Sequence, residues 1–442
     1  MKKAASFIRH YLLARRGARR WQDRAAFDRW REERVLRHIA RVRRESPFYR
    51  ELWEGIADAD WRAFPEIDKS AMMAGFDRLN TVGIAKSEAF AVAEAAERSR
   101  DFTPALRGIT VGLSSGTSGN RGLFLVSPEE QAAWAGTVLG KLLPVSLLSR
   151  FKIAFFLRAN SNLYASVGNR RLAFGFYDLL DPIEAHLRRL RAERPDLIAA
   201  PPSMLRSLAD ASLAGKLDGV RPRRIVAAAE VLDPLDRATI ERAFGQTVHQ
   251  VYQCTEGFLG CTCAHGTLHL NEDLVYIEKA NVPGKPGTFV PIVTDFSRRT
   301  QPIVRYRLND LLVERAAPCP CGSPFTAIER IEGRCDDIFY ASALQPGAAP
   351  VPVYPDFVTR AVIGASSEIE QYRVVQTAPD RWTVELDLRD GDLRQAAESR
   401  IQQAVEALCE RLGCAAPVLS FTSYARMAGD RKLRRVERRY AP

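Results

Sequence analysis

Apolar and polar segments alternate in a regular order from residue 109 onward. Short apolar segments, typical of buried strands, occupy residues 109–113, 152–157, 197–202, 224–230 and 247–253. Segments with helical spacing of apolar residues lie between them, at 127–143, 181–194, 202–215 and 233–245. Because strands that alternate with helices are usually parallel and covered on both faces, this order predicts an α/β core.

The pattern changes on both sides of this core. Residues 20–45 are strongly helix-forming, and residues 265–332 are rich in strands. After Gly333 comes a smaller unit with two strands (371–378 and 381–388), a long helix (392–413) and a basic tail. We predict a basic helical arm over 1–50, a large N-terminal domain over 51–333 with mostly parallel sheets plus a strand-rich subdomain, and a small mobile α+β C-terminal domain over 334–442.

Composition places the chain among ordinary globular proteins. Of its 442 residues, 46% are hydrophobic and 26% are charged, and no apolar run approaches the ~18 residues that cross a bilayer. The first residues resemble a signal peptide, but Arg9 and His10 interrupt the apolar part. We therefore expect a cytoplasmic protein.

The net charge of +11 comes from residues 1–50, which hold 16 Lys/Arg and 5 Asp/Glu. A solvated or self-docked arginine-rich helix is the favoured interpretation. Peripheral contact with an anionic membrane through this arm is the alternative, and no nucleic-acid partner is expected.

A glycine- and hydroxyl-rich segment, LSSGTSGNRGLF, follows the first predicted strand of the core at residues 113–124. Glycines let the backbone approach a ligand closely, and hydroxyl and backbone N–H groups can surround a phosphate. Taken alone, such a segment is more commonly a Gly/Ser linker.

Three further motifs follow in order. YQCTEG (252–257) comes directly after an apolar strand, at the edge where open α/β sheets bind ligands. YRLND (306–310) ends in an aspartate that can accept both ribose hydroxyls. GRCDD (333–337) lies where the pattern changes, which suits a hinge.

Together with SPFYRE, FPEIDKSAM and the terminal GDRKLRRV, these motifs resemble the adenylate-forming acyl ligase superfamily, in particular its phenylacetate–CoA ligase branch. The resemblance extends over nearly the whole chain. It implies an α/β enzyme that uses ATP and Mg²⁺ to convert a carboxylic acid to an acyl-adenylate with release of pyrophosphate. The acyl group then passes to a thiol, either CoA or a carrier-protein thiol.

The resemblance also implies residue roles. The loop over the ATP phosphates would comprise Ser114, Ser115, Gly116, Thr117, Ser118 and Gly119. The adenine and ribose sites would comprise Ala228, Ala229, Glu230, Tyr252, Asp310 and Arg334, with the hinge at Asp336. Thr255 would bind phosphate, Glu256 would bind Mg²⁺, and Lys432 would stabilise charge during adenylation.

Two departures from the family pattern stand out. The loop continues as Asn120-Arg121-Gly122 where the family commonly has Pro-Lys-Gly, so Arg121 is the candidate to supply the missing charge, although its planar guanidinium is not equivalent to an ammonium. The segment after the hinge, 340–357, is rich in Pro, Gly and Ala, which leaves capture of the second substrate by CoA open.

Five of the eight cysteines lie in two tight groups, which in a cytosolic chain favours metal over disulfide. A closed tetrahedral site for structural zinc, as in some members of that branch, would use Cys263, His269, Cys319 and Cys321, with Cys261 or His265 as substitutes. Buried free thiols are the alternative.

The acid is expected between the phosphate loop and the YQCTEG strand, with Phe156 (or Phe155), Arg158 and Asn160 as candidate lining. Core packing is the default for the two phenylalanines, so Arg158 and Asn160 are the better candidates. An aryl acid is the first expectation by family analogy and a fatty acid the second. Two other functions stay open: a family member that binds nucleotide without turnover, and a basic zinc-containing protein that binds membrane or nucleic acid.

Overall fold

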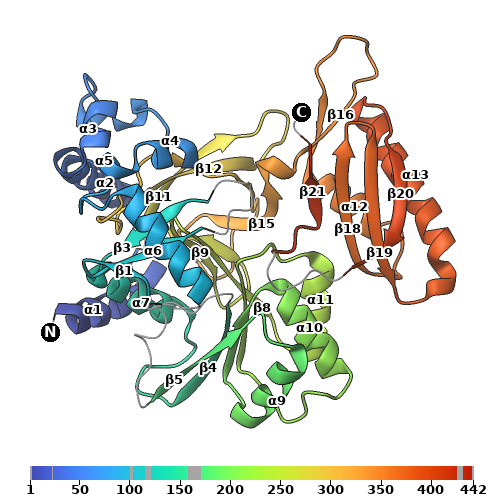
Figure 1. The fold of residues 1–442 in the computed structure, drawn as a ribbon, viewed down its shortest axis with the longest axis horizontal. Helices are drawn as coiled ribbons and strands as arrows, with labels where there is room; N and C mark the ends of the chain where they lie inside the picture. The colour runs from blue at the N-terminus through green and yellow to red at the C-terminus, as the bar shows by residue number, and fades with distance from the viewer. Residues whose placement is uncertain are drawn as a thin grey trace.

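A computed structural model describes residues 2–21, 23–99, 103–114, 121–157, 171–425 and 432–440. Its centre is a twelve-stranded mixed sheet with the order β11-β12-β14-β15-β10-β9-β8-β7-β6-β4-β5, in which β13 also pairs with β12. Figure 1 shows this sheet running through the middle of the molecule, with the C-terminal unit to one side.

One half of the sheet is parallel. Its strands are β4 (Phe151–Leu157), β5 (Leu172–Asp178), β6 (Leu197–Ala200), β7 (Arg224–Ala228) and β8 (Val248–Cys254). All four residues of β6 are buried, as expected for a strand that is covered on both faces. The α/β fold class with a parallel sheet is confirmed.

Helices cover both faces of this half. On one face, α9 (Ile183–Glu193), α10 (Pro202–Leu213) and α11 (Pro234–Phe244) enclose a core that includes Phe156, Leu205 and Ile240. On the other face, α7 (Pro128–Leu142) packs over Phe151, Ile153 and Val226 (Figure 1). A capping box starts α7, since Ser127 and Glu130 each bond the backbone of the other.

The other half of the sheet is antiparallel. It contains β9 (Gly257–Thr262), β10 (Leu268–Leu270), β11 (Val275–Asn281), β12 (Thr288–Asp295), β13 (Tyr306–Arg307), β14 (Asp310–Glu314) and β15 (Ala327–Arg334). All eight residues of β12 are buried. This half is the predicted strand-rich region, although β9, β10 and β15 were not among the strands expected from the sequence.

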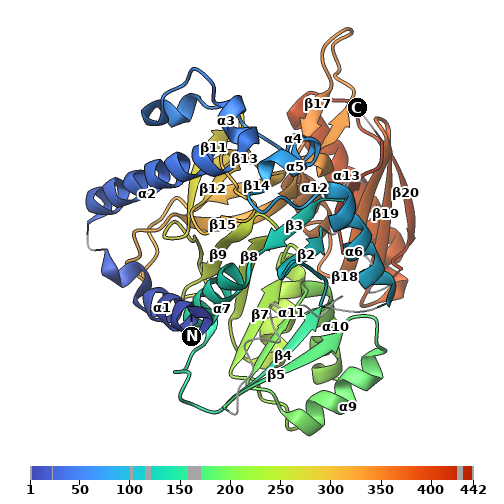
Figure 2. The same ribbon diagram turned by 60° about the vertical axis from the view of Figure 1, so that its left-hand side comes forward.

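The N-terminal helices pack on the large domain. Figure 2 shows α1 (Lys2–Arg16) beside α7 and α2 (Arg24–Glu45) along the antiparallel half of the sheet. A Cβ on Gly136 of α7 would lie 2.3 Å from the Phe7 carbonyl oxygen, so the glycine permits a very close approach of the two helices. Val35, Ile39 and Val42 of α2 join the core under the antiparallel strands. The arm is therefore docked on its own chain.

Shorter elements lie between α1 and α2 and between α2 and the core. They are η1 (Gly17–Arg20), α3 (Pro47–Leu52), η2 (Asp58–Ala63), α4 (Lys69–Ala74), α5 (Phe76–Leu79), α6 (Lys86–Ser99), and a three-stranded sheet of β1 (Ala105–Leu106), β2 (Ile109–Leu113) and β3 (Leu123–Val126). Residues 115–120 join β2 to β3 and lie outside the described residues.

The C-terminal unit is a separate layer with its own core around Tyr372, Trp382 and Ile401. It begins with η3 (Cys335–Asp337), and contains the hairpin β16 (Phe339–Ala341) and β17 (Val351–Val353), α12 (Pro355–Ile363), β18 (Ile369–Ala378), β19 (Arg381–Leu388), η4 (Gly391–Leu393), α13 (Arg394–Leu412), β20 (Val418–Ser423) and β21 (Val436–Arg438). The basic tail adds β21 to the sheet parallel to β18. No helix in the described ranges is long and apolar enough to span a bilayer.

Candidate active site

A cleft of about 2320 Å³ opens at the carboxyl ends of β7 and β8, between the large domain and the C-terminal unit. Strand ends of a parallel sheet meet along one edge, which is why segments far apart in the sequence converge here. The cleft is lined by Ala228–Glu230, Tyr252–Gly257, Tyr306–Asp310, Gly333, Arg334 and Lys432–Val436, among others. Most of the predicted motifs therefore share one cavity.

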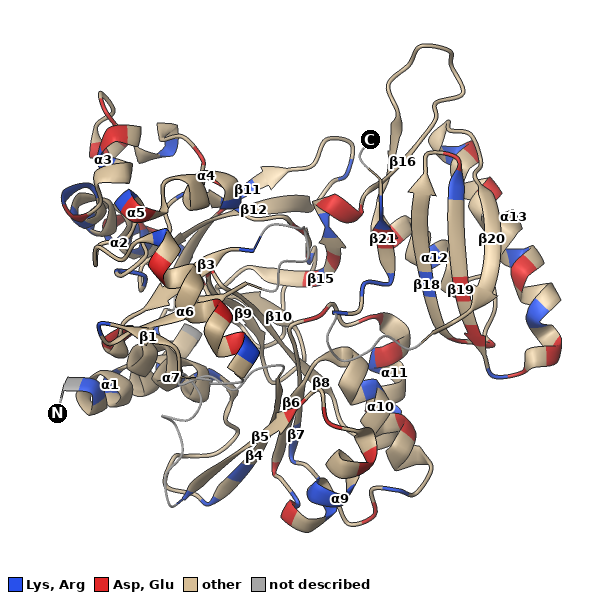
Figure 3. Ribbon diagram, in the orientation of Figure 1, with Lys and Arg blue, Asp and Glu red and all other residues tan. Residues whose placement is uncertain are grey.

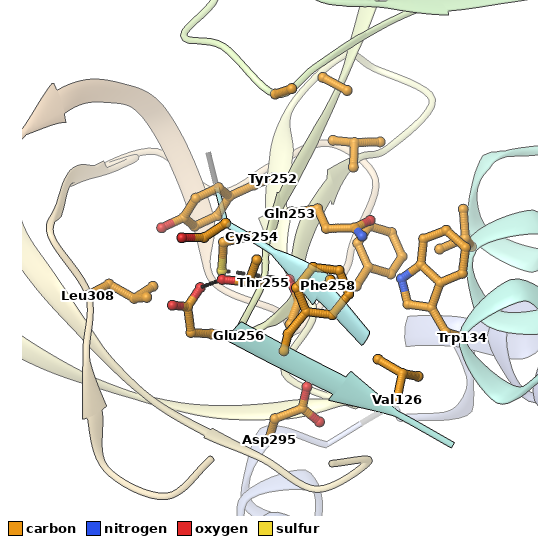
Figure 4. A pocket seen from close by; sticks show the side chains of 18 of the residues that line it. Val126, Trp134, Tyr252, Gln253, Cys254, Thr255, Glu256, Phe258, Asp295 and Leu308 are labelled. Atoms are coloured by element: carbon orange, nitrogen blue, oxygen red, sulfur yellow. Dashed lines mark hydrogen bonds between the residues drawn. The ribbon is translucent and has the colours of Figure 1, made fainter. Parts of the chain in front are cut away.

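The YQCTEG segment lies in the middle of the cleft (Figure 4). The Thr255 hydroxyl donates a hydrogen bond to a carboxylate oxygen of Glu256 over 2.8 Å. Burial, followed by the nearby charge of Glu256, raises the pKa of Tyr306, so that phenol stays protonated beside the carboxylate. Glu256 thus presents a hydrogen-bonded carboxylate toward the cavity.

Asp310 and Tyr252 are directly paired. The Tyr252 hydroxyl donates to Asp310 over 2.7 Å, and the Arg334 guanidinium lies 3.9 Å from the other carboxylate oxygen. Burial raises the pKa of Asp310, while the hydrogen bond from Tyr252 and the charges of Arg334 and Lys432 oppose that rise. Two basic groups from different domains therefore act on one partly buried carboxylate.

The basic tail enters the cleft from the C-terminal unit, and Figure 3 shows it in blue below β21. The Leu433 amide donates to Glu230 over 3.1 Å, and the other oxygen of Glu230 accepts from the Ser203 amide at the start of α10, also over 3.1 Å. Glu230 therefore joins α10 to the segment that carries Lys432. Ala229, next to it, has a φ of +70°, a sparsely populated conformation for a residue with a side chain.

The arginines that follow Lys432 bind the tail both to the large domain and to the C-terminal unit. Arg435 contacts Asp236 of α11 over 2.6 Å and donates to the Tyr372 carbonyl of β18 over 2.9 Å. Arg434 pairs with Asp337 of η3. Burial raises the pKa of Asp337 to about 6, and the charge of Arg434 opposes that rise.

Residues at the neck of the predicted phosphate loop are described, although most of that loop is not. The Ser114 amide donates to the Gly122 carbonyl over 2.7 Å, and the Gly122 amide donates to the Ser114 hydroxyl over 2.8 Å. Ser115, Gly116, Thr117, Ser118 and Gly119 lie outside the described residues. Arg121 lines the cleft and is ion-paired with Glu97 of α6.

Lys69 was not predicted as a site residue. It is the first residue of α4, which is capped by Asp68, and it lines the cleft at the neck of the loop. A Cβ on Gly122 would come within 2.9 Å of the Lys69 Cε. Burial lowers the pKa of Lys69, and the nearby Glu256 opposes that shift. The motif FPEIDKSAM contains this lysine. The feature that could have identified it from the sequence is a cation at the start of a capped helix.

The acyl-pocket prediction is corrected at one residue. Phe156 lies on the opposite face of β4, where its ring packs against Tyr177 and His186. Phe155 lines the cleft instead, because successive side chains of a strand point to opposite faces. Arg158 and Asn160 lie outside the described residues.

At the predicted hinge, Gly333 has a φ of +139°, which favours glycine, and Arg334 precedes the short turn η3. The Asn309 amide donates to Asp336, so the YRLND and GRCDD motifs are in contact. Both motifs line the same cleft.

The four cysteine and histidine residues chosen from the sequence form one cluster away from this cleft. The ligand atoms of Cys263, His269, Cys319 and Cys321 all lie within 4.8 Å of one another. Cys263 and Cys319 have their sulfur atoms 3.7 Å apart, too far for a disulfide but close to the ~3.8 Å edge of a tetrahedron with zinc–sulfur bonds of about 2.3 Å.

The histidine is oriented for ligation. Its Nδ1 faces the Phe325 carbonyl at 3.0 Å, so a proton on Nδ1 leaves the lone pair of Nε2 directed at Cys321 Sγ, 3.3 Å away. The donor set thus fits zinc. Of the substitutes, Cys261 contacts Asn271 and His265 is exposed, and neither is part of the cluster.

No family model and no curated protein sequence matches this chain. Its fold, in contrast, is similar to that of several solved ligase structures. A 2-hydroxyisobutyryl-CoA ligase in a postadenylation state with its acyl-AMP has 20% identity over 93% of this chain and 89% of its own, with a TM-score of 0.70.

The same ligase in the thioesterification state, with CoA, has a TM-score of 0.57 at 19% identity, over 94% of this chain and 91% of its own. The amide bond synthetase McbA from Marinactinospora thermotolerans has 15% identity over 74% of this chain and 67% of its own, with a TM-score of 0.52.

Proposed function

We propose that the protein uses ATP to activate a carboxylic acid as an acyl-adenylate and then transfers the acyl group to a thiol such as CoA. One observation carries the proposal: the cleft brings together Glu256, Asp310 and Lys432, each in a separate motif, at the edge where α/β sheets bind ligands. The solved structures with this fold include a CoA ligase captured with its acyl-AMP.

In the first step, a carboxylate oxygen of the acid attacks the α-phosphorus of ATP, the bond between the α- and β-phosphates breaks, and pyrophosphate leaves. Such a step is accelerated mainly by positioning and by preorganised positive charge. Lys432 is proposed to stabilise the charge on the reacting phosphate. Asp310 and Arg334 are proposed to hold the ribose, and Tyr252 and residues 228–230 the base.

Lys69 is proposed to act on the outer phosphates, since it lies at the neck of the phosphate loop, next to Gly122. Arg121 is the second candidate there and would have to leave Glu97 to reach them.

In the second step, the thiol sulfur attacks the acyl carbon, AMP leaves with the electron pair of the broken acyl–oxygen bond, and the thiol proton passes to solvent. CoA is the proposed acceptor and a carrier-protein thiol the alternative.

Two metals fit residues of the chain. Glu256 offers a carboxylate oxygen inside the cleft, a hard ligand suited to Mg²⁺, which when bound would offset the charge of the phosphates. Cys263, His269, Cys319 and Cys321 would hold Zn²⁺ in a closed structural site, because all four positions of a tetrahedron are filled by protein.

The test is to incubate the protein with ATP, Mg²⁺, CoA and a panel of aryl and fatty acids. We expect pyrophosphate, AMP and the acyl-CoA in equal amounts, each dependent on the acid. ATP binding without any of these products would instead indicate a nucleotide-binding protein that lacks turnover.

A further inference from the structure

Part of the cleft lining is strongly basic. Arg9 of α1, Arg20 of η1, Arg34 of α2, and Arg298 and Arg299 of the connection from β12 to β13 all line the cleft. We call these five residues the basic wall. They meet because α1 and α2 dock on the large domain (Figure 2). Some of the charge excess of residues 1–50 therefore faces the cleft.

Ring contacts and charges show that these arginines are neighbours. The guanidinium carbon of Arg34 lies 5.1 Å from the centre of the Trp30 ring and 5.3 Å from that of Phe296. The guanidinium carbon of Arg20 lies 6.0 Å from the centre of the same Trp30 ring. Burial, followed by the charges of nearby arginines that include Arg9, lowers the pKa of Arg34. Like charges are thus held close together by aromatic contacts.

The guanidinium groups of the basic wall have hydrogen-bonding capacity left over. Within the described ranges of the chain, none of the five arginines forms an ion pair. In Arg298, Nε and Nη2 are shielded from solvent and have no acceptor among the described residues. A buried donor without an acceptor is unfavourable, and native proteins usually provide a partner for it. The basic wall is therefore suited to an anion.

Three carboxylates act on these arginines, but each is held by other groups. Both oxygens of Asp273 lie 3.0 Å from Lys141 Nζ. Glu130 accepts hydrogen bonds from three backbone amides. Asp295 accepts from the amide of Ser297 over 2.7 Å and from its hydroxyl over 2.6 Å. The basic wall therefore keeps an excess of positive charge.

The basic wall begins close to the YQCTEG segment. A Cβ on Gly257, next to Glu256, would lie 2.7 Å from a carboxylate oxygen of Asp295. Arg298 follows three residues later, and its amide donates to the Asp295 carbonyl over 3.4 Å. Figure 4 shows Asp295 in the same pocket as Glu256 and Phe258. A molecule that binds beside Glu256 and extends past Asp295 meets these arginines.

We propose that the basic wall binds an anionic group, a carboxylate or a phosphate, of a molecule that reacts in the cleft. The planar guanidinium group forms paired hydrogen bonds with either of these anions. Two reactants offer such a group away from the reacting atom: an acid that carries a second anionic group, and a thiol acceptor that carries phosphates. The inference rests on the proposed function, since that reaction defines the two sources.

The first experiment tests anion binding without turnover. Thermal unfolding is followed while inorganic phosphate replaces chloride at constant ionic strength, with a non-hydrolysable ATP analogue present to occupy the nucleotide site. Phosphate raises the Tm of most proteins because it is excluded from their surface, so the readout is the difference between proteins. We expect a larger rise in the wild type than in Arg34→Gln or Arg298→Gln, since only the wild type keeps the complete site.

The matched control is Arg29→Gln, because Arg29 is an exposed arginine of the same helix α2 outside the cleft. It should show the wild-type rise. Arg298 lies outside the contact of Arg34 with Trp30, so Arg298→Gln gives an independent result if Arg34→Gln does not fold. An equal rise in the wild type and in all variants that fold would overturn the inference.

The second experiment identifies the source of the anion. Acid-dependent pyrophosphate release is compared for straight-chain dicarboxylic acids and monocarboxylic acids of the same length, and thioester formation is compared for CoA and for pantetheine, which lacks phosphates. If the acid is the source, the preference for dicarboxylic acids should fall about 10- to 100-fold in Arg34→Gln and Arg298→Gln. If the acceptor is the source, the preference for CoA should fall instead.

The outcomes separate this inference from the proposed function. Turnover in which neither preference changes in the two variants would overturn the inference and leave the proposed function intact. A phosphate-dependent rise in Tm that requires Arg34 and Arg298, with no pyrophosphate from any acid, would support the anion site while sinking the proposed reaction.

Discussion

At the scale of single residues, Lys432 carries the sharpest prediction. Replacing Lys432 by Ala should lower the rate of acid-dependent pyrophosphate release by about 100- to 1000-fold, the usual effect of removing one preorganised charge-stabilising group. Because Lys432 is assigned to adenylation alone, thioester formation from a supplied acyl-adenylate and CoA should be affected much less.

The matched control is Arg439→Ala, which removes a cation from the same tail outside the cleft, where Arg439 is half exposed and paired with Glu437. It should keep the wild-type rate. Equal losses in the two variants, or equal losses in both half-reactions of the Lys432 variant, would refute the assigned role.

The buried histidine His38 should make the stability of the folded protein sensitive to acid. Burial, together with the charges of Arg41, Arg34 and Arg299, lowers the pKa of His38 to about 3. The unfolded chain takes up this proton near pH 6.5, whereas the folded protein does not, so His38 favours folding above that pH and the contribution is lost as pH falls toward 3.

Thermal unfolding measured from pH 7 to pH 4 should therefore show a smaller loss of Tm in a His38→Gln variant than in the wild type. The polar glutamine keeps an acceptor for Arg41, which donates to His38 Nδ1 over 2.7 Å. Parallel Tm curves would show that His38 contributes nothing to the acid sensitivity.

The residue scale also shows what the sequence could and could not predict. Residue types and spacing pointed to the four clustered Cys and His residues but left Cys261 and His265 as substitutes, and only the fold shows which four lie together. The choice of Phe156 over Phe155 was wrong, since a strand pattern gives two faces and only the tertiary fold decides which one meets the cleft. Lys69 was not predicted as a site residue because it lies far from the predicted phosphate loop in the sequence.

At the scale of elements, the Cys/His cluster joins two segments. Cys263 and His269 belong to the β9–β10 hairpin, and Cys319 and Cys321 to the connection from β14 to β15. The purified protein should contain one zinc ion per chain, and Cys263→Ser should lose it and lower the Tm. Cys261→Ser is the control, because Cys261 lies on the same hairpin outside the cluster, and it should keep its zinc.

Metal analysis of the two variants and of the wild type decides this point. Zinc absent from all three proteins would indicate free thiols, and zinc lost from the Cys261 variant alone would show that the ligand set is wrong.

The contact between α1 and α7 depends on small residues. Gly136→Ala would place a Cβ 2.3 Å from the Phe7 carbonyl, so we expect a loss of about 1–3 kcal/mol in stability and faster proteolysis within residues 2–21. Glycine to alanine inside a helix would otherwise stabilise it by about 1 kcal/mol.

Gly391→Ala serves as the control, because no atom lies within 4 Å of the position its Cβ would take. It should leave both stability and proteolysis of α1 unchanged. A Gly136→Ala protein as stable as the wild type would mean that α1 does not depend on this close approach.

Several elements could not be predicted because their pairing is long-range. The strand β20 is mostly exposed, with only Leu419 and Phe421 partly buried, and β21 lies in a basic tail. β21 becomes a strand only because β18, some sixty residues earlier, offers it an edge. In the parallel half, β4, β6, β7 and β8 were predicted because β6 and β7 carry continuous buried apolar residues in the local sequence. β5 was missed, and the predicted strand 109–113 is β2 of a separate three-stranded sheet.

At the scale of the whole molecule, the C-terminal unit is docked with its tail in the cleft. Contacts from Arg435 to Asp236 and from the Leu433 amide to Glu230 bridge the large domain and the tail. We propose that the unit moves about the segment near Asp336 between the two proposed half-reactions.

The central claim, that the protein forms an acyl-adenylate, is tested most directly by the exchange of labelled pyrophosphate into ATP without any thiol. We predict exchange that requires both Mg²⁺ and a carboxylic acid and that is nearly abolished in the Lys432→Ala variant. No acid-dependent exchange by a protein that binds ATP would contradict the account.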